Sequence, residues 1–286
     1  MKKIKLSILA IIAICSVQSA MAWGSVGHLC AAYIAEQHLT PEAKAKCRHY
    51  LKHTLPYYAM WMDHWRGTKQ FEAINNGHSL KTTKDGRKIS WESFASGTMG
   101  TNISTPPGRA MGHLYNAFNE LSDGKYKNLS DSVVRQRLIN MIHYVADMHC
   151  PSHCGFPDHI YLPSSTYNLK RNGKHANFHS FWDGSPGFKR KKLTLKKYAN
   201  MVDNVSPKQA KKWQRGLEKR NLQAGIGSWG KECIKNAHQA YAILPEGTDI
   251  AKLTKEQVEQ VHDLADHAIL IGAYRLAYVL NTIFAE

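Results

Sequence analysis

The segment from His143 to His153, which reads His-Tyr-Val-Ala-Asp-Met-His-Cys-Pro-Ser-His, limits the possible folds more than any other part of the chain. His143 and Asp147 are four residues apart, so a helix places them one turn apart on the same face. Pro151 ends that helix, and His153 follows at its exit. Imidazole and carboxylate groups gathered at a helix end are typical of a site for zinc or a similar metal. The alternative is a polar helix face followed by a surface loop.

Apolar residues recur at helical spacing along most of the chain and predict an all-α protein. We expect helices at 24–37, 41–51, 57–65, 109–121 and 131–148 and a largely helical remainder from 193 to 284, with breaks near 207, 225–227 and 245–254. Thr40 with Pro41, and later Ser130, are the expected helix caps. Alternating apolar runs are too short for a sheet of any size, and no linker is evident. One mostly helical domain is therefore predicted.

The first 22 residues are typical of a cleavable export signal. A lysine-rich start precedes an apolar run, Leu6 to Val17, and the sequence Ala-Met-Ala at 20–22 matches a cleavage site. The apolar run is too short to cross a bilayer as a mature helix. We expect a mature domain of residues 23–286 that begins at Trp23 and is secreted or periplasmic.

The mature chain is strongly basic. Losing Lys2, Lys3 and Lys5 with the leader lowers the formal net charge from +16 to +13. A charge of this sign suits polyanions such as nucleic acid, or an anionic membrane surface. Ordinary surface lysine is the alternative explanation, in particular for the lysine-rich stretch at 189–197.

Cysteine usage leaves the disulfide pattern open. Cys15 leaves with the leader, and five cysteines remain, at positions 30, 47, 150, 154 and 233. Export permits disulfides, but an odd count leaves at least one thiol without a partner in the chain. Cys30 with Cys47 and Cys150 with Cys154 are possible pairs by sequence proximity alone. The second pair flanks a histidine and could also brace a metal site, although we do not predict that it binds the metal.

Three further features carry metal-binding side chains. Asp63 lies among tryptophans, and a carboxylate there needs a partner because burying an unpaired charge is costly. That partner is either Arg66 or a metal. His78 follows in a long irregular segment, 67–106, and such loops are more often functional than idle. His179 and Asp183 then repeat the spacing of four residues.

Taken together, these motifs resemble the secreted zinc-dependent single-strand nucleases, the family that includes mung bean nuclease. The shared motifs are Trp23-Gly-x-x-Gly-His28, Trp-x-Asp63, His78, His143-x-x-x-Asp147 with Pro-x-His153, and His179-x-x-x-Asp183. Their order along the chain is also that of the family, and the resemblance extends from the mature start to at least Asp183.

The resemblance implies a mostly helical fold that holds three zinc ions in a cleft. Carried over residue by residue, the first ion takes Asp63, His78, His143 and Asp147, and the second takes His153, His179 and Asp183. The third takes the amino group and carbonyl oxygen of Trp23 with His28, and Asp147 bridges to it. Neutral imidazole and carboxylate are ligands that suit zinc.

The implied activity is hydrolysis of single-stranded DNA and RNA to 5′-phosphate products, together with 3′-nucleotidase activity. Asp63, Asp147 and Arg66 are the expected catalytic residues. Arg66 lies three residues after Asp63 and contacts phosphate if the resemblance holds, or otherwise only pairs with that carboxylate. Stacking of unpaired bases on aromatic side chains gives single-strand preference, with Trp65, Phe156 and Tyr161 as candidates.

One position departs from the family pattern. The family places an acid shortly after the histidine that corresponds to His78, whereas this chain has Lys81 there. Lys81 could bind phosphate, or Asp85 could supply the missing carboxylate. The substitution affects the expected rate and substrate preference and leaves the metal ligands intact.

Two other functions stay open. Zinc-dependent bacterial phospholipase C is similar in fold and ligands, and it hydrolyses a lipid phosphodiester. The basic charge and the lack of an evident lipid-binding segment favour the nuclease, so we expect no stable membrane association and no obligate protein partner. A zinc-loaded protein that binds phosphate compounds without turnover is the third possibility, supported only by Lys81.

Overall fold

The fold is described from a computed structural model of the 286-residue chain. The structure describes residues 23–65, 78–80, 82–83, 87–90, 110–154, 167–214 and 222–285. The expected leader lies outside these residues. So do Arg66, Lys81 and Asp85, together with the stacking candidates Phe156 and Tyr161.

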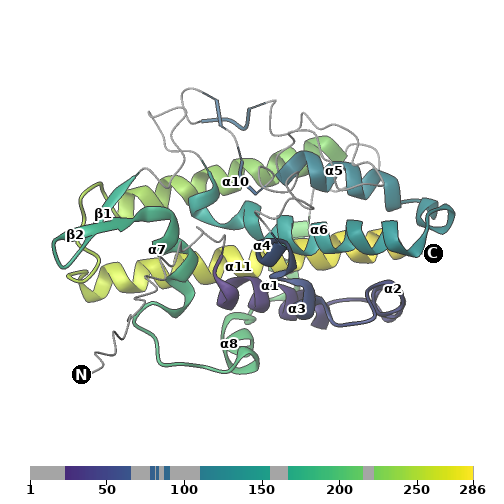
Figure 1. Ribbon diagram of the computed structural model, residues 1–286, viewed down its shortest axis with the longest axis horizontal. Helices are drawn as coiled ribbons and strands as arrows, with labels where there is room; N and C mark the ends of the chain where they lie inside the picture. The colour runs from purple at the N-terminus through teal and green to yellow at the C-terminus, as the bar shows by residue number, and fades with distance from the viewer. Residues whose placement is uncertain are drawn as a thin grey trace, which may run out of the picture.

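Helices make up most of the described chain (Figure 1). The α-helices are α1 (Ser25–Gln37), α2 (Pro41–Leu51), α3 (Leu55–Tyr58), α4 (Trp61–Trp65), α5 (Ala110–Leu121), α6 (Asp131–His149), α7 (Phe178–Gly184), α8 (Leu195–Val202), α9 (Pro207–Gln214), α10 (Leu222–Ile243) and α11 (Lys255–Phe284). Short 3₁₀ helices are η3 (Lys125–Asn128), η4 (Pro151–His153) and η6 (Ser185–Gly187), and β1 (Asn168–Arg171) pairs antiparallel with β2 (Lys174–Asn177). The prediction of a mostly helical domain is confirmed.

Helix α6 lies at the centre of the packing. It contacts α1, α2, α5 and α11, and every residue from Arg137 to His149 is buried. A helix surrounded in this way is apolar on most of its faces. The polar side chains on its last turns are therefore placed inside the protein, where they need partners.

The longest helix, α11, runs along the length of the molecule beside α6 and α10 (Figure 1). Its apolar residues from Val261 to Leu280 form the broad buried stripe that the sequence predicts. By length and composition α11 is apolar enough to cross a membrane, but 78% of its apolar window is buried inside the protein. That burial is typical of the core helix of a globular domain.

Several element boundaries follow the sequence signals. Thr40 Oγ1 accepts a hydrogen bond of 3.2 Å from the Ala43 N–H, as expected of the cap of α2. Ser130 is the N-cap residue of α6, as predicted, although its side chain makes no capping hydrogen bond. Its hydroxyl instead lies 3.0 Å from the hydroxyl of Ser132.

Two predicted boundaries differ from the structure, and a third is confirmed. The expected helix at 57–65 is divided into α3 and α4. The break near 207 is confirmed, because α8 ends at Val202 and Pro207 begins α9 at the first helical position, where no N–H is needed. Helix α10 continues through 225–227, since glycine costs a helix only about 1 kcal/mol and packing compensates.

No helix was expected between 148 and 193, yet the described part of this range contains η4, a hairpin, α7 and η6. The β1–β2 hairpin turns at Asn172 and Gly173, whose φ angles of 51° and 77° suit the Asn-Gly turn. Asn177 then caps α7, with Oδ1 accepting from the Ser180 N–H at 2.9 Å. These local signals are short and polar, which is why helical periodicity did not reveal them.

The five cysteines of the described chain are all buried and free. Neither Cys30 with Cys47 nor Cys150 with Cys154 forms the disulfide considered from sequence proximity. The thiol of Cys47 has a pKa raised to about 12 by burial and by Glu36. That thiol therefore stays protonated at neutral pH.

Candidate metal centre

The exit of α6 is fixed by proline. Cys150 is extended, with φ −67° and ψ 122°, because Pro151 disfavours helical geometry in the residue before it. The N–H of Cys150 still donates to the Asp147 carbonyl oxygen at 3.0 Å, which closes the last turn. Pro151 then starts η4 and brings His153 back beneath the helix end. The predicted helix end followed by a histidine is thus formed by α6 and η4.

The first group of donors lies against the inner face of α6. It consists of Asp63 from α4, His78 and His143, whose ligand atoms lie within 4.8 Å of one another. His143 Nε2 lies 3.7 Å from Asp63 Oδ1 and 3.1 Å from Asp147 Oδ2. His143 donates Nδ1–H to the Ala59 carbonyl oxygen at 2.8 Å, so Nε2 is turned toward the group.

A second group shares residues with the first. His28 of α1, His143 and Asp147 also lie within 4.8 Å of one another. The His28 and His143 rings are stacked at 4.3 Å. Asp147 presents Oδ1 to His28 Nε2 at 3.2 Å and Oδ2 to His78 Nδ1 at 2.7 Å. One carboxylate therefore faces both groups, each with a different oxygen.

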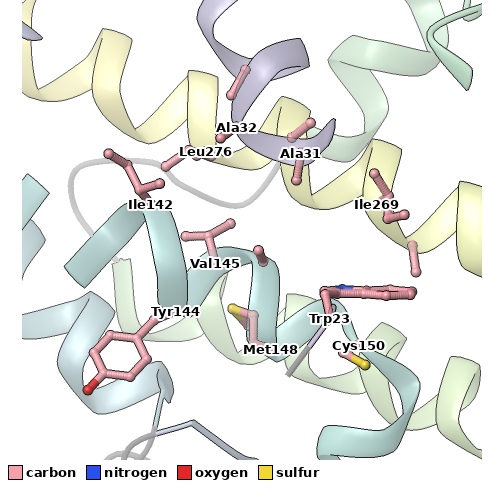
Figure 2. Close-up of a cluster of buried hydrophobic side chains, with 14 of the residues drawn as sticks. Trp23, Ala31, Ala32, Ile142, Tyr144, Val145, Met148, Cys150, Ile269 and Leu276 are labelled. Carbon is pink, nitrogen blue, oxygen red and sulfur yellow. The ribbon is translucent and has the colours of Figure 1, made fainter. Parts of the chain in front are cut away.

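Trp23 lies where α1 begins, and its side chain is fully buried. Figure 2 draws its indole in the same cluster of buried side chains as Ile269 of α11 and Cys150 at the end of α6. A Cβ on Gly27 would lie 3.0 Å from the Trp23 Cβ, so a larger residue would crowd the Trp23 side chain. The indole anchors the segment that precedes α1 near the exit of α6.

The third group lies between η4 and α7. Cys150, His153 and Asp183 have ligand atoms within 4.8 Å of one another. His179 lies beside this group. Its ring stacks on His153 with a centroid distance of 4.9 Å, and its Nε2 lies 3.7 Å from Asp183 Oδ2. His179 has 15% of its side chain exposed, so this group has an edge toward solvent.

All eight side chains expected to bind metal are thus placed in three adjoining groups, and only Cys150 was not expected among them. Sequence reasoning had noted Cys150 beside His153 without assigning it. Trp65, the described stacking candidate, is 38% exposed and follows Asp63 on α4. Arg66 lies outside the described residues.

The electrostatics of the groups favour a cation. Burial alone would raise the pKa of Asp147, but the charge of His143 beside it holds it well below its ordinary value. Burial lowers the pKa of His153 to about 3 and, with His143, lowers that of His28. Asp147 is therefore ionised, while His28 and His153 are neutral and keep a lone pair for a metal.

His143 differs from the other histidines. Burial alone would lower its pKa, but the carboxylates of Asp147 and Asp63 raise it to about 9. In the absence of metal a proton on this ring balances the two acids. A bound dication would supply the same positive charge at the same place.

Orphaned polar atoms test whether a metal fits. Among the described residues, Nδ1 of His28 and Nε2 of His78 and of His153 are buried without a hydrogen-bond partner. Each such atom costs about 1–3 kcal/mol unless something satisfies it. Imidazole nitrogens and carboxylate oxygens are the donors that zinc takes. The residues present therefore fit a zinc cluster.

Comparison with known proteins agrees with this geometry. The S1/P1 nuclease family matches residues 23–285. The chain belongs to the S1/P1 nuclease family. Nuclease PA3 of a Penicillium species is 24% identical over 281 residues, which cover 91% of this chain and 97% of the relative. Nuclease P1 of Penicillium citrinum gives the same identity and coverage.

Membership of the S1/P1 nuclease family places this protein in a class of phosphodiester hydrolases, and the three groups of donors give that class a physical basis. Nucleic acids are the substrate class of the S1/P1 nuclease family. Its mostly helical fold is the S1/P1 nuclease fold. The buried histidine, aspartate and cysteine groups are the places where metal can bind.

Proposed function

We propose that this protein is an exported trinuclear-zinc nuclease that hydrolyses single-stranded DNA and RNA to 5′-phosphate products and also acts as a 3′-nucleotidase. The observation that carries the proposal is the position of Asp147 between two groups of histidines, with one oxygen toward each. A carboxylate in this position can bridge two ions, and metal pairs of this kind are used in phosphodiester hydrolysis.

The proposed ligands are those expected from the sequence. The first ion takes Asp63, His78, His143 and Asp147, and the second takes His153, His179 and Asp183. The third takes the Trp23 amino group and carbonyl oxygen with His28, and Asp147 is shared. When bound, these ions supply Lewis acidity toward phosphate and lower the pKa of water to near neutrality.

The protein's own side chains keep these donors in place. Ala59 holds the His143 ring through Nδ1, and the His78 carbonyl oxygen accepts from Nδ1–H of His153. Hydrogen bonds of this kind fix the ring tautomer and direct the other nitrogen to the metal. Asp63 and Asp147 act as catalytic ligands, and Arg66 either contacts the substrate phosphate or pairs with Asp63.

Single-strand preference is supported by aromatic side chains beside the first group. The Trp65 ring is partly exposed on α4, with Trp61 at 6.3 Å and His64 edge-on at 5.4 Å. A base can stack on an exposed ring of this kind only when it is not paired within a duplex.

Export is part of the proposal. The family match begins at residue 23, which is the first residue after the expected cleavage site. Cleavage there would free the amino group that the third ion requires. We propose that residues 1–22 are removed and that the mature domain, 23–286, acts in the periplasm or outside the cell.

One assay series tests the function. Purified mature protein with zinc is offered single-stranded DNA, RNA, a 3′-mononucleotide and phosphatidylcholine. Cleavage of the three nucleotide substrates is expected. Cleavage of the lipid alone would establish a phospholipase C instead. Binding without cleavage of any substrate would establish the non-catalytic zinc protein.

A further inference from the structure

The thiol of Cys150 lies among donors that the proposed function assigns to the second ion. Its ligand atom is within 4.8 Å of those of His153 and Asp183, and Cys150 itself is fully buried. Its Sγ lies 3.9 Å from Asp183 Oδ1 and 3.1 Å from Ser152 Oγ. No function described so far uses this sulfur.

His153 is an independent indication that a ligand belongs there. Its Nδ1–H donates to the His78 carbonyl oxygen. Among the described residues its Nε2 has no hydrogen-bond partner, although His153 is only 3% exposed. A buried neutral imidazole with one anchored and one open nitrogen is the usual state of a metal ligand.

The distances suit coordination by a single ion. Zinc binds sulfur at about 2.3 Å and oxygen at about 2.0–2.2 Å, so two such ligands at a tetrahedral angle are separated by about 3.5 Å. The observed 3.9 Å between Cys150 Sγ and Asp183 Oδ1 is close to this value. The ligand atom of His153 lies within 4.8 Å of the other two.

The local fold holds the sulfur in this position. Cys150 is the C-cap of α6 and the residue before η4, so it is separated from His153 by a single 3₁₀ turn. Residues three apart in a 3₁₀ helix lie on the same side. The end of α6 therefore directs both side chains toward α7 and Asp183.

We propose that the Cys150 thiolate is a fourth protein ligand of the second ion, beside His153, His179 and Asp183. The inference rests on the proposed metal centre and adds a sulfur donor to it. When Cys150 binds the ion, a metal–sulfur bond forms and the S–H bond breaks. The released proton passes to solvent. Four protein ligands close a tetrahedral zinc site, as in structural sites. The second ion then joins η4 to α7.

A different role for Cys150 has to be distinguished. The thiol could remain protonated and only donate a long hydrogen bond to Asp183 Oδ1, as the 3.9 Å separation also permits. Cys150 would then orient the carboxylate without touching the metal. Direct coordination and orientation differ in whether sulfur contacts the ion.

Cobalt substitution tests this contact directly. Mature protein is stripped of metal and titrated with Co²⁺, and sulfur-to-cobalt charge-transfer absorption is recorded in the near ultraviolet. We expect this absorption in the unchanged protein and in the matched control Cys154→Ser, which alters another buried free thiol of the same segment. We expect Cys150→Ser to lose it completely while binding cobalt at the remaining sites.

The unchanged protein alone can overturn the proposal, so a Cys150→Ser variant that fails to fold does not prevent a decision. Full cobalt loading without charge-transfer absorption would contradict sulfur ligation, and so would absorption that survives Cys150→Ser. Cleavage of single-stranded DNA by the zinc form is measured separately. Cleavage without the sulfur signal contradicts only this inference, whereas the signal without cleavage contradicts only the proposed nuclease function.

Discussion

The backbone N–H of Gly24 donates a hydrogen bond of 2.8 Å to the carbonyl oxygen of Asp183. This bond ties the start of α1 to α7, although the two residues are far apart in the sequence. On the α1 side of this bond lie Trp23 and His28, which are proposed ligands of the third ion. On the α7 side lies Asp183, a proposed ligand of the second ion. The spacing between the proposed second and third ions therefore depends on this main-chain contact.

Replacing Gly24 tests that dependence. A Cβ at this position would lie 2.9 Å from the Asp183 carbonyl oxygen, a backbone atom that cannot easily move away. We expect Gly24→Ala to lower the free energy of unfolding by about 1–3 kcal/mol, as overpacking does. Zinc content should fall as well. Thermal unfolding and metal analysis measure the two effects.

Gly184 offers a matched control, because it follows Asp183 directly and a Cβ there meets no atom within 4 Å. Gly184→Ala should keep its full zinc content. Equal zinc loss in both variants would contradict a specific role for the Gly24 contact.

Asp147 and Asp183 should differ in how many ions they hold. Asp147 faces two groups of histidines, whereas Asp183 belongs to one. We expect Asp147→Ala to lose more than one equivalent of zinc and Asp183→Ala about one, by the ligand assignment for each site. Metal analysis of the dialysed proteins gives the counts. Full zinc occupancy in Asp147→Ala would refute the bridging role.

The amino terminus should be a ligand only when Trp23 is the first residue. One extra residue in front of it removes the free amino group from the proposed third site. We expect the extended protein to lose one zinc equivalent and most of its activity, since two of that ion's donors come from Trp23. A fully active extended form would count against ligation by the amino group.

Arg275 of α11 should stabilise the fold behind the metal centre. Its guanidinium is buried and donates to Glu232, to the Trp213 carbonyl oxygen at 3.2 Å and to His149 at 2.8 Å. Burial, together with the Arg275 charge, lowers the pKa of His149 to about 3, so the ring is neutral and accepts.

Replacing Arg275 leaves the partly buried carboxylate of Glu232 without its cationic partner. We expect Arg275→Met to cost about 3–5 kcal/mol of unfolding free energy, as for a broken buried ion pair. Lys255 pairs with Glu259 at 3.8 Å on the surface of the same helix. Lys255→Met should cost less than about 1 kcal/mol. Denaturant unfolding of both variants compares them, and similar losses would show that burial of Arg275 is unimportant.

Sequence spacing predicted α1, α2, α5 and α6 because these helices combine periodic apolar residues with clear ends. It could not predict α7, which is seven residues long and starts from a polar hairpin. Helices this short have little periodicity of their own, and tertiary packing determines whether they form.

The donors were identified from motifs, but their grouping required the fold. Which oxygen of Asp147 faces which histidine depends on how α1 and the segment around His78 approach α6. The inclusion of Cys150 depends on the turn made by η4. Neither relationship is encoded in local spacing, since each joins segments that are distant in the chain.

The proposed centre also has a consequence for the order of events during folding. His78 and Asp147, which lie in contact, are separated by 69 residues, and the other proposed donors span positions 23 to 183. Contacts of such range form late, because long loops must close first. Ions that bind only the folded chain stabilise it by mass action. We therefore expect zinc to act after the helices have assembled, slowing unfolding rather than speeding folding.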